Sequence, residues 1–392
     1  MSTLNKTSDV TPSRAQAFST RLLSWYACSG RHDLPWKADP TPYRVWVSEV
    51  MLQQTQVSTA LPYFLRFMEQ FPDVQTLANA PEDAVLATWT GLGYYRRARN
   101  LWNAARELVA NQHGELPDDP IDLERLPGIG RSTAGAIAAL AFNRRAAILD
   151  GNVKRVLARI YGIDEWPGLR HVETRLWTLA EAHTPTEHAA DYTQAIMDLG
   201  ATICTRRRPR CTECPVVGLC AAHRQDRVAD WPAPRPRRVL PERTTHMLIL
   251  EDRSGRMLLQ RRETQGVWGG LWCFPEHSPE DDQLTIARRL SGDEDTEVTV
   301  LKTPETLSHQ FTHFRLHIRF AHLRLGRSSP IRAATTHLGN PPESLQDGEP
   351  AYSHVQPTTA WFAANGVRTV GLAAPVIRHL ARHRFIESTE HG

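Results

Sequence analysis

The 392-residue sequence lacks any apolar run long enough to cross a bilayer, and its first residues lack the apolar stretch of a secretory signal. A membrane protein is therefore not expected, and we predict a cytoplasmic, intracellular location. Charge of one sign is not in large excess either, because the formal net charge is +3. Bulk charge therefore does not indicate a nucleic-acid partner. The chain is too long for one ordinary core, so two or three domains are expected.

Cysteine is scarce, with six residues, and four of them form the array C-x6-C-x2-C-x5-C: Cys204, Cys211, Cys214 and Cys220. Cys28 and Cys273 stand alone and are expected to be small buried side chains. The array contains one C-x2-C pair and no second pair that would complete a typical zinc site. Zinc and a cubane iron–sulfur cluster are the two alternatives, and the crowding of four thiols on one loop favours the cluster.

The first half of the chain has the pattern of a helical protein. Apolar residues recur with helical period over residues 57–68, 98–108 and 153–161, and prolines fall between these segments. Residues 1–14 are polar and are expected to be a disordered lead-in. We therefore predict an all-α region over residues 15–226 that ends with the cysteine array.

The pattern changes after residues 227–243, which are rich in proline and arginine and predict an extended, exposed linker. Beyond the linker, alternation of apolar and polar residues is typical of strands, and helical segments are fewer. This predicts a separate α+β domain over residues 244–386. The segments that carry the pattern are strands at 245–250, 256–260 and 314–320 and helices near 286–290 and 374–381.

The stretch Leu126–Gly130 predicts a tight turn before a helix of small residues. Such a turn directs successive backbone N–H groups outward, and the helix dipole adds partial positive charge, so a phosphate oxygen can bind there. Asp150 follows about twenty residues later, immediately before another helix. Its ordinary role would be an N-cap. A phosphate site beside an isolated acid also fits a protein that grips a nucleic-acid backbone and does chemistry next to it.

Together, the turn, Asp150 and the cysteine array resemble the helix-hairpin-helix DNA glycosylases of the endonuclease III superfamily. The whole chain resembles the MutY-type adenine DNA glycosylases. The resemblance implies a mainly α N-terminal region, with a six-helix barrel module and an iron–sulfur module at loop 204–220, joined to an α+β NUDIX-like domain. It also implies a [4Fe-4S] cluster, double-stranded DNA as the partner and a monomer. The closer match rests on LPW at 34–36, WVSEVMLQQTQV at 46–57, GLGYYRRARN at 91–100 and WGGLWCFP at 268–275.

The resemblance assigns the chemistry to two carboxyl groups. Glu49 matches the general acid that protonates adenine, although its helical position alone would suit a solvated glutamate. Asp150 matches the carboxylate that stabilises positive charge on the sugar, and Asn152 matches a residue that supports the pair. Ser132 lies where bifunctional members carry a lysine. Because serine cannot form a Schiff base, we expect base release without strand cleavage.

Further positions match DNA-contacting residues of the family. Gln54 and Tyr94 match residues that insert into the duplex when a base is flipped out, and Thr55 is expected near the opposite base. A polar helix end and a packed aromatic are the ordinary alternatives for the first two. Leu34 and Trp36 are expected to wall the adenine pocket, with core packing as the alternative. Residues expected to contact the DNA backbone are Gly128, Gly130, Lys154 and Arg206.

The second domain is expected to recognise DNA rather than to hydrolyse nucleotides. Phe311, Thr312 and His313 lie at the family's F-S-H position, which senses 8-oxoguanine, and threonine stands here in place of serine. An active NUDIX enzyme needs an R-E-x-x-E-E run, and the acids after Pro275 are not spaced that way. The resemblance therefore implies neither a magnesium site nor pyrophosphohydrolase activity.

The expected function is a monofunctional adenine DNA glycosylase of base excision repair that flips out and excises adenine mispaired with 8-oxoguanine or guanine. Three other functions are kept as alternatives: a bifunctional glycosylase for damaged pyrimidines, a non-catalytic iron–sulfur DNA-binding protein, and a nucleotide pyrophosphohydrolase. Ser132 and the second domain disfavour the first of these, and the missing acidic run disfavours the last.

Overall fold

The computed structural model describes residues 10–236, 239–264, 266–326, 358–363 and 366–382. The chain divides into two compact units, and the division does not follow the sequence strictly. The first unit comprises the described part of Met1–Ala80 together with Arg96–Arg237. The second comprises Pro81–Tyr95 together with the described part of Arg238–Gly392.

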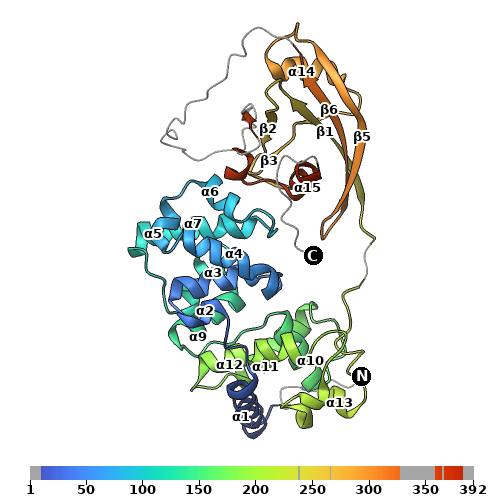
Figure 1. The fold of residues 1–392 in the computed structure, drawn as a ribbon. Helices are drawn as coiled ribbons and strands as arrows, with labels where there is room; N and C mark the ends of the chain where they lie inside the picture. The colour runs from blue at the N-terminus through green and yellow to red at the C-terminus, as the bar shows by residue number, and fades with distance from the viewer. Residues whose placement is uncertain (1–9, 237–238, 265, 327–357, 364–365, 383–392) are drawn as a thin grey trace, which may run out of the picture. The chain divides into compact units, whose positions relative to one another are not determined.

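The described residues of the first unit form helices joined by loops, with no strand, which confirms the all-α prediction (Figure 1). Its helices are α1 (Pro12–Ser29), α2 (Pro35–Ala38), α3 (Pro42–Leu52), α4 (Val57–Gln70), α5 (Val74–Asn79), α7 (Arg96–Gln112), α8 (Pro120–Arg125), α9 (Arg131–Phe142), α10 (Gly151–Tyr161), α11 (Arg170–His183), α12 (Ala189–Asp198) and α13 (Ala221–Arg224). The π-helical turn η2 (Leu199–Ile203) continues α12, and two short 3₁₀ turns, η3 (Cys211–Glu213) and η4 (Val217–Leu219), lie in the cysteine loop.

A shared apolar core fixes α10, which begins with Gly151 and Asn152 directly after Asp150. Val153, Val156 and Leu157 of α10 are fully or almost fully buried and pack in one cluster with side chains of α1, α11 and α12. Each buried aliphatic side chain contributes roughly 2 kcal/mol by leaving water. Since the buried face determines how α10 is rotated, it also determines where the N-terminus of α10 points.

Two predicted boundaries differ from the structure. Of the predicted lead-in, residues 1–9 lie outside the described residues, but α1 already begins at Pro12 because the Thr11 hydroxyl accepts a hydrogen bond from the Arg14 N–H. The predicted linker is not wholly exposed. Trp231 is buried, and its carbonyl accepts a hydrogen bond of 2.9 Å from Arg159 Nε, so the start of the linker packs on the first unit. Residues 237–238 of the linker lie outside the described residues.

The second unit is a mixed sheet with helices, as the α+β prediction requires. The strands are β1 (Glu242–Glu251), β2 (Met257–Arg261), β3 (Trp272–Cys273), β4 (Glu276–His277), β5 (Val298–Gln310), β6 (Arg315–Leu325) and β7 (Thr359–Phe362). Their order is β3-β2-β1-β6-β5, with β4 paired to β1 and β7 to β2; β1 and β6 run parallel and the other pairs antiparallel. Figure 1 shows β1, β6 and β5 as long neighbouring strands. The helices of this unit are α6 (Glu82–Thr88), α14 (Gln283–Ser291) and α15 (Ala374–Arg382), with the 3₁₀ turn η5 (Gly366–Thr369).

The two lone cysteines differ in their surroundings. Cys273 is buried, as predicted, whereas Cys28 is exposed on α1, so the prediction for Cys28 is wrong. The apolar face of α1 carries Phe18 and Leu22, and Cys28 lies near the helix end, outside that face. Within the described ranges, no helix is long and apolar enough to span a membrane.

Candidate active site

A cavity of about 980 Å³ lies in the first unit, where α3, the starts of α9 and α10, and the end of α12 meet. Residues far apart in the sequence line it together. Eight of the predicted site residues are among them: Leu34, Trp36, Glu49, Gln54, Thr55, Ser132, Asp150 and Asn152.

Glu49 projects into the cavity from α3, a helix whose neighbouring residues Ser48 and Val50 are buried. Burial and, to a smaller extent, the nearby charge of Asp150 together raise the pKa of Glu49 from its ordinary value to about 7. A carboxyl group with this pKa is half protonated near neutrality. It can therefore donate a proton there and take one back later.

Asp150 is the N-cap of α10, so the ordinary alternative for this residue is correct. One carboxylate oxygen accepts a hydrogen bond of 2.8 Å from the Val153 N–H, and the other accepts one of 3.1 Å from Asn152 Nδ2. Burial is the largest influence and leaves the pKa of Asp150 above its ordinary value, while these donors and the positive charge of Arg155 act in the opposite direction and favour the ionised form. The same side chain faces the cavity that Glu49 lines, so capping and chemistry are compatible.

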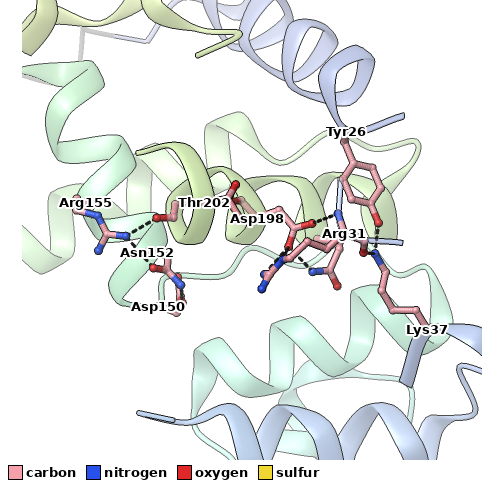
Figure 2. A network of polar contacts seen from close by, with 10 residues as sticks. Tyr26, Arg31, Lys37, Asp150, Asn152, Arg155, Asp198 and Thr202 are labelled. Atoms are coloured by element: carbon pink, nitrogen blue, oxygen red, sulfur yellow. Dashed lines mark hydrogen bonds and ion pairs between the residues drawn. The ribbon is translucent and has the colours of Figure 1, made fainter. Parts of the chain in front are cut away.

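Arg155 was not identified from the sequence, and it lies beside Asn152 and Asp150 (Figure 2). Its Nη2 donates to Asn152 Oδ1 at 2.8 Å and to the Gly200 carbonyl at 2.6 Å, and its Nε donates to the Cys204 carbonyl at 2.7 Å. Gly200 lies in the π-helical turn η2, where a Cβ would come within 2.5 Å of Asn152 Cβ. Only a glycine allows Asn152 to lie this close to the turn.

A second network, around Asp198, was also not identified from the sequence (Figure 2). Asp198 is fully buried at the end of α12, and its carboxylate accepts hydrogen bonds from the backbone N–H and the guanidinium of Arg31 at 2.6 to 3.0 Å. Gln194 Nε2 donates to the same carboxylate at 2.9 Å. Both Arg31 and Gln194 line the cavity. No motif marked them, because arginine and glutamine side chains usually face water.

Ser132 lines the cavity at the start of α9, and the glycine turn comes directly before that helix. Ser132 Oγ accepts a hydrogen bond of 2.9 Å from the Leu149 N–H, which fixes the residue before Asp150. Gly130 is the N-cap of α9, and Gly128 has a φ of +80° with Asn100 so close that a Cβ would lie 2.6 Å from Asn100 Cβ. The turn is therefore tightly packed as well as left-handed.

The C-terminal end of α3 is fixed by Arg97, which lies on α7. Arg97 is buried in α7 and donates from Nη1 to the carbonyls of Val50, Met51 and Gln53. Those carbonyls have no further turn of helix to bond to. Gln54 follows with a φ of +58°, and it lines the cavity. Arg97 therefore holds the chain direction at the predicted insertion residue.

The other predicted residues do not line this cavity. Lys154 Nζ pairs with Glu173 at 2.5 Å, and Arg206 is exposed in the cysteine loop. Tyr94 and the recognition residues Phe311, Thr312 and His313 belong to the second unit. Tyr94, Thr312 and His313 are exposed.

The four cysteines of the array line one small cavity with Arg159. Arg159 is buried and donates to Cys204 Sγ at 3.3 Å and to the Thr205 carbonyl at 2.8 Å. Within the described residues, no group of three metal-ligating side chains is arranged to hold a single ion. Four thiols around one cavity, with a cation close to one sulfur, suit a negatively charged thiolate cluster.

Three segments match known families. Residues 47–182 match the HhH-GPD superfamily base excision DNA repair proteins, residues 204–220 the iron–sulfur binding domain of endonuclease III, and residues 246–382 the NUDIX domain. Relatives extend over nearly the whole chain. The adenine DNA glycosylase of Buchnera aphidicola subsp. Schizaphis graminum is 34% identical over 92% of this chain and 96% of its own length.

The adenine DNA glycosylase of Homo sapiens is also 34% identical, over 80% of this chain and 68% of the human protein. Among solved structures, a thermostable thymine-DNA glycosylase is 27% identical and has a TM-score of 0.51, covering 55% of this chain and 100% of its own. About half of this chain is therefore similar in fold to a solved structure.

Proposed function

The chain belongs to the adenine DNA glycosylases of base excision repair, and from that premise we propose that it excises adenine paired with 8-oxoguanine or guanine in duplex DNA. The adenine is flipped out of the helix and the sugar–phosphate backbone stays intact. The observation that carries the proposal is the placement of Glu49 and Asp150 in one cavity with different surroundings.

Glu49 acts as the general acid. Adenine is a poor leaving group until a ring nitrogen is protonated, and a carboxyl group with a pKa of about 7 supplies that proton at physiological pH. Leu34 and Trp36 are 8% and 5% exposed and give the cavity an apolar wall for the flipped ring. After the base has left, the ionised Glu49 can accept a proton from the attacking water.

Asp150 stabilises the positive charge that develops on the sugar. Its two oxygens are held by Val153 and Asn152, and Asn152 is in turn held by Arg155, so the carboxylate has a fixed direction. Because the Asp150 carboxylate is already held in place, no side chain has to rearrange when the bond between adenine and the sugar breaks. The division of labour, with one protonated and one ionised carboxyl group, parallels that of retaining glycosidases.

Strand cleavage is not expected, because no amine takes the position of Ser132. Its hydroxyl is engaged with the Leu149 N–H, and serine cannot form a Schiff base. Lys154 is nearby in sequence but pairs with Glu173. We assign Lys154, together with Gly128, Gly130 and Arg206, to contacts with DNA phosphates.

The roles of the domains follow from this assignment. Residues 15–226 form the catalytic region, and residues 227–243 connect the domains. Residues 244–386 inspect the base opposite adenine. Within that last range, residues 327–357, 364–365 and 383–386 lie outside the described residues. The described recognition loop is compact, since the Phe311 N–H donates to the Phe314 carbonyl at 2.9 Å and Thr312 Oγ1 lies 3.3 Å from His313 Nδ1. Thr312 and His313 are exposed, which leaves both side chains accessible to a DNA base, and we assign them to 8-oxoguanine recognition.

An iron–sulfur cluster is bound by Cys204, Cys211, Cys214 and Cys220, and we propose the [4Fe-4S] type. Each cysteine would hold one iron. The Arg155 and Arg159 hydrogen bonds to the Cys204 backbone and sulfur would then tie the cluster loop to the start of α10. With the cluster bound, the four cysteines would hold the loop in a fixed shape, so that exposed Arg206 is presented to DNA phosphates. We propose no nucleotide hydrolysis by the second domain.

The proposal is tested with duplexes that carry adenine opposite 8-oxoguanine, guanine or thymine. We expect breaks only after alkali treatment and fastest excision opposite 8-oxoguanine. Breaks without alkali would refute the absence of strand cleavage, and excision of oxidised thymine instead of adenine would refute the substrate. A protein that contains zinc and no iron would refute the cluster.

A further inference from the structure

The segment Pro81–Tyr95 lies inside the region that matches the helix-hairpin-helix glycosylases, yet it packs as part of the second unit. Two ion pairs join it to the sheet. Arg261 of β2 lies 3.1 Å from Glu82 and 3.4 Å from Asp83, both on α6. These charges are partly buried, so the contact is specific and not merely a pair of solvated side chains.

A close backbone approach reinforces this contact. At Gly371 an added Cβ would lie 2.6 Å from Leu86 Cβ, so no other residue permits the present spacing. Leu86 itself is fully buried, and α6 also packs against η5. The segment is therefore held on the second unit by charge and by close packing.

Tyr95 makes the central hydrogen bonds of this contact. It is 9% exposed, and its hydroxyl donates to the Leu372 carbonyl at 2.7 Å. The same hydroxyl accepts a hydrogen bond of 3.2 Å from the Gly91 N–H. One buried oxygen thus joins the loop that begins at Gly91 to the chain at Leu372, and it uses both its donor and its acceptor function.

The loop that Tyr95 holds has a strained backbone. Gly91 and Gly93 have φ values of +100° and +78°, and Tyr94 has a φ of +51°, which is unfavourable for a residue with a Cβ. The Trp89 indole donates to the Gly93 carbonyl at 3.1 Å. Tyr94, which is 51% exposed, therefore projects from a loop whose shape depends on its attachments.

The attachments continue to the recognition loop within the same unit. The Trp272 N–H donates to the Gly371 carbonyl at 2.9 Å, and the Leu271 N–H donates to the Trp268 carbonyl at 3.0 Å. The Trp268 ring lies 5.3 Å from the ring of Phe311, measured between centroids. A run of direct contacts thus extends from Phe311 to the loop of Tyr94.

We propose that Tyr95 is a positioning residue through which the sheet of the second unit sets the conformation of the loop that carries Tyr94. The inference rests on the proposed function, in which Tyr94 inserts into DNA and the loop at Phe311 meets 8-oxoguanine. Tyr95 would make insertion dependent on a correctly seated recognition loop. Excision opposite 8-oxoguanine would then depend on the Tyr95 hydroxyl more than excision opposite guanine does.

The test compares Tyr95→Phe with Tyr43→Phe in the full-length, cluster-containing protein. Tyr43 is a matched control, because its buried hydroxyl also donates to a backbone carbonyl, that of Phe71 at 2.9 Å, but in the first unit. Single-turnover excision is measured opposite 8-oxoguanine and opposite guanine. Loss of one buried hydrogen bond predicts a decrease of roughly tenfold opposite 8-oxoguanine for Tyr95→Phe. The decrease opposite guanine should be smaller, and Tyr43→Phe should not change the ratio of the two rates.

A double-mutant cycle separates positioning from general stability. If Tyr95 acts through Tyr94, then Tyr95→Phe should have little further effect once Tyr94→Ala is present. Fluorescence of 2-aminopurine placed opposite 8-oxoguanine reports base extrusion, and Tyr95→Phe should lower it. Gly371→Ala would push Leu86 away from the chain at Gly371, so it should also lower the 2-aminopurine fluorescence. It serves as the second variant if Tyr95→Phe does not fold.

Additive effects of Tyr95→Phe and Tyr94→Ala, or an unchanged ratio of the two excision rates, would overturn the inference. These results would leave the proposed function intact, provided that the wild-type protein excises adenine opposite 8-oxoguanine. A wild-type protein without that activity would instead refute the proposed function itself.

Discussion

The raised pKa of Glu49 leads to a quantitative prediction of pH dependence. With a pKa of about 7, roughly 90% of the protein carries a protonated Glu49 at pH 6 and roughly 10% at pH 8. Because only the protonated form donates to adenine, the single-turnover excision rate should fall about tenfold between these pH values. Glu49→Gln has no such proton to donate, so its rate should be lower by about 10² to 10⁴.

The same pKa has a consequence for stability, with a definite sign. The folded-state pKa of Glu49 lies above its ordinary value of 4.5, so the folded protein binds the proton more tightly than the unfolded chain does. The stability contribution is fully present below pH 4.5 and is lost as the pH rises to about 7. The loss is at most about 3 kcal/mol, because each unit of pKa difference corresponds to about 1.4 kcal/mol. Glu49→Gln should remove this part of the pH dependence.

The assay measures single-turnover excision of adenine opposite 8-oxoguanine from pH 5.5 to 9, with DNA binding measured in parallel. Glu107→Gln is the matched control, because Glu107 is an exposed glutamate on α7, and its profile should equal that of the wild type. A flat wild-type profile between pH 6 and 8, or Glu49→Gln with wild-type rates, would refute the reasoning. Lost DNA binding by Glu49→Gln would point to a structural defect instead.

Three further predictions concern the surroundings of the acid pair. Asp150→Asn keeps an N-cap, so DNA binding should be retained while single-turnover excision falls by on the order of 10²-fold or more; near-wild-type excision would exclude the charge-stabilising role. Ser132→Lys places an amine where the hydroxyl now bonds to Leu149, and borohydride should trap a covalent DNA complex that the wild type does not form. Gly200→Ala would put a Cβ 2.5 Å from Asn152 Cβ, so excision should fall in the same assay while cysteine-bound iron, measured by absorbance, is retained. Unchanged excision by Gly200→Ala would show that the π-helical turn does not position Asn152.

Many helices and strands could be predicted, because they depend on the spacing of apolar and polar residues that are close together in the sequence. Helices over residues 57–68, 98–108 and 153–161 agree with α4, α7 and α10, since an apolar stripe with helical period must face a core. The strand alternation at 314–320 likewise agrees with β6. The boundary at Pro12 was missed because the capping role of Thr11 depends on one backbone hydrogen bond that the polar composition of the segment conceals.

The site could be predicted only where a residue type is distinctive for its chemistry. Four crowded cysteines and a glycine turn limit the chemistry strongly, and the motif around Glu49 is long enough to carry a resemblance. Arg155, Arg97 and the Arg31–Asp198–Gln194 network carry no such mark. Their partners are up to 167 residues away, and hydrogen bonds over that separation depend on how helices pack.

The sequence alone determined the family, the succession of a helical region and a sheet domain, the cysteine array and the serine in place of a lysine, because each is a matter of residue type and short-range spacing. Tertiary structure decided the rest. It brought Glu49 and Asp150 into one cavity, and it raised the pKa of Glu49 through burial and a neighbouring charge. It also placed Pro81–Tyr95 on the second unit, although the family match runs through that segment. Burial, electric field and the choice of packing partner are properties of the folded chain, and no local pattern encodes them.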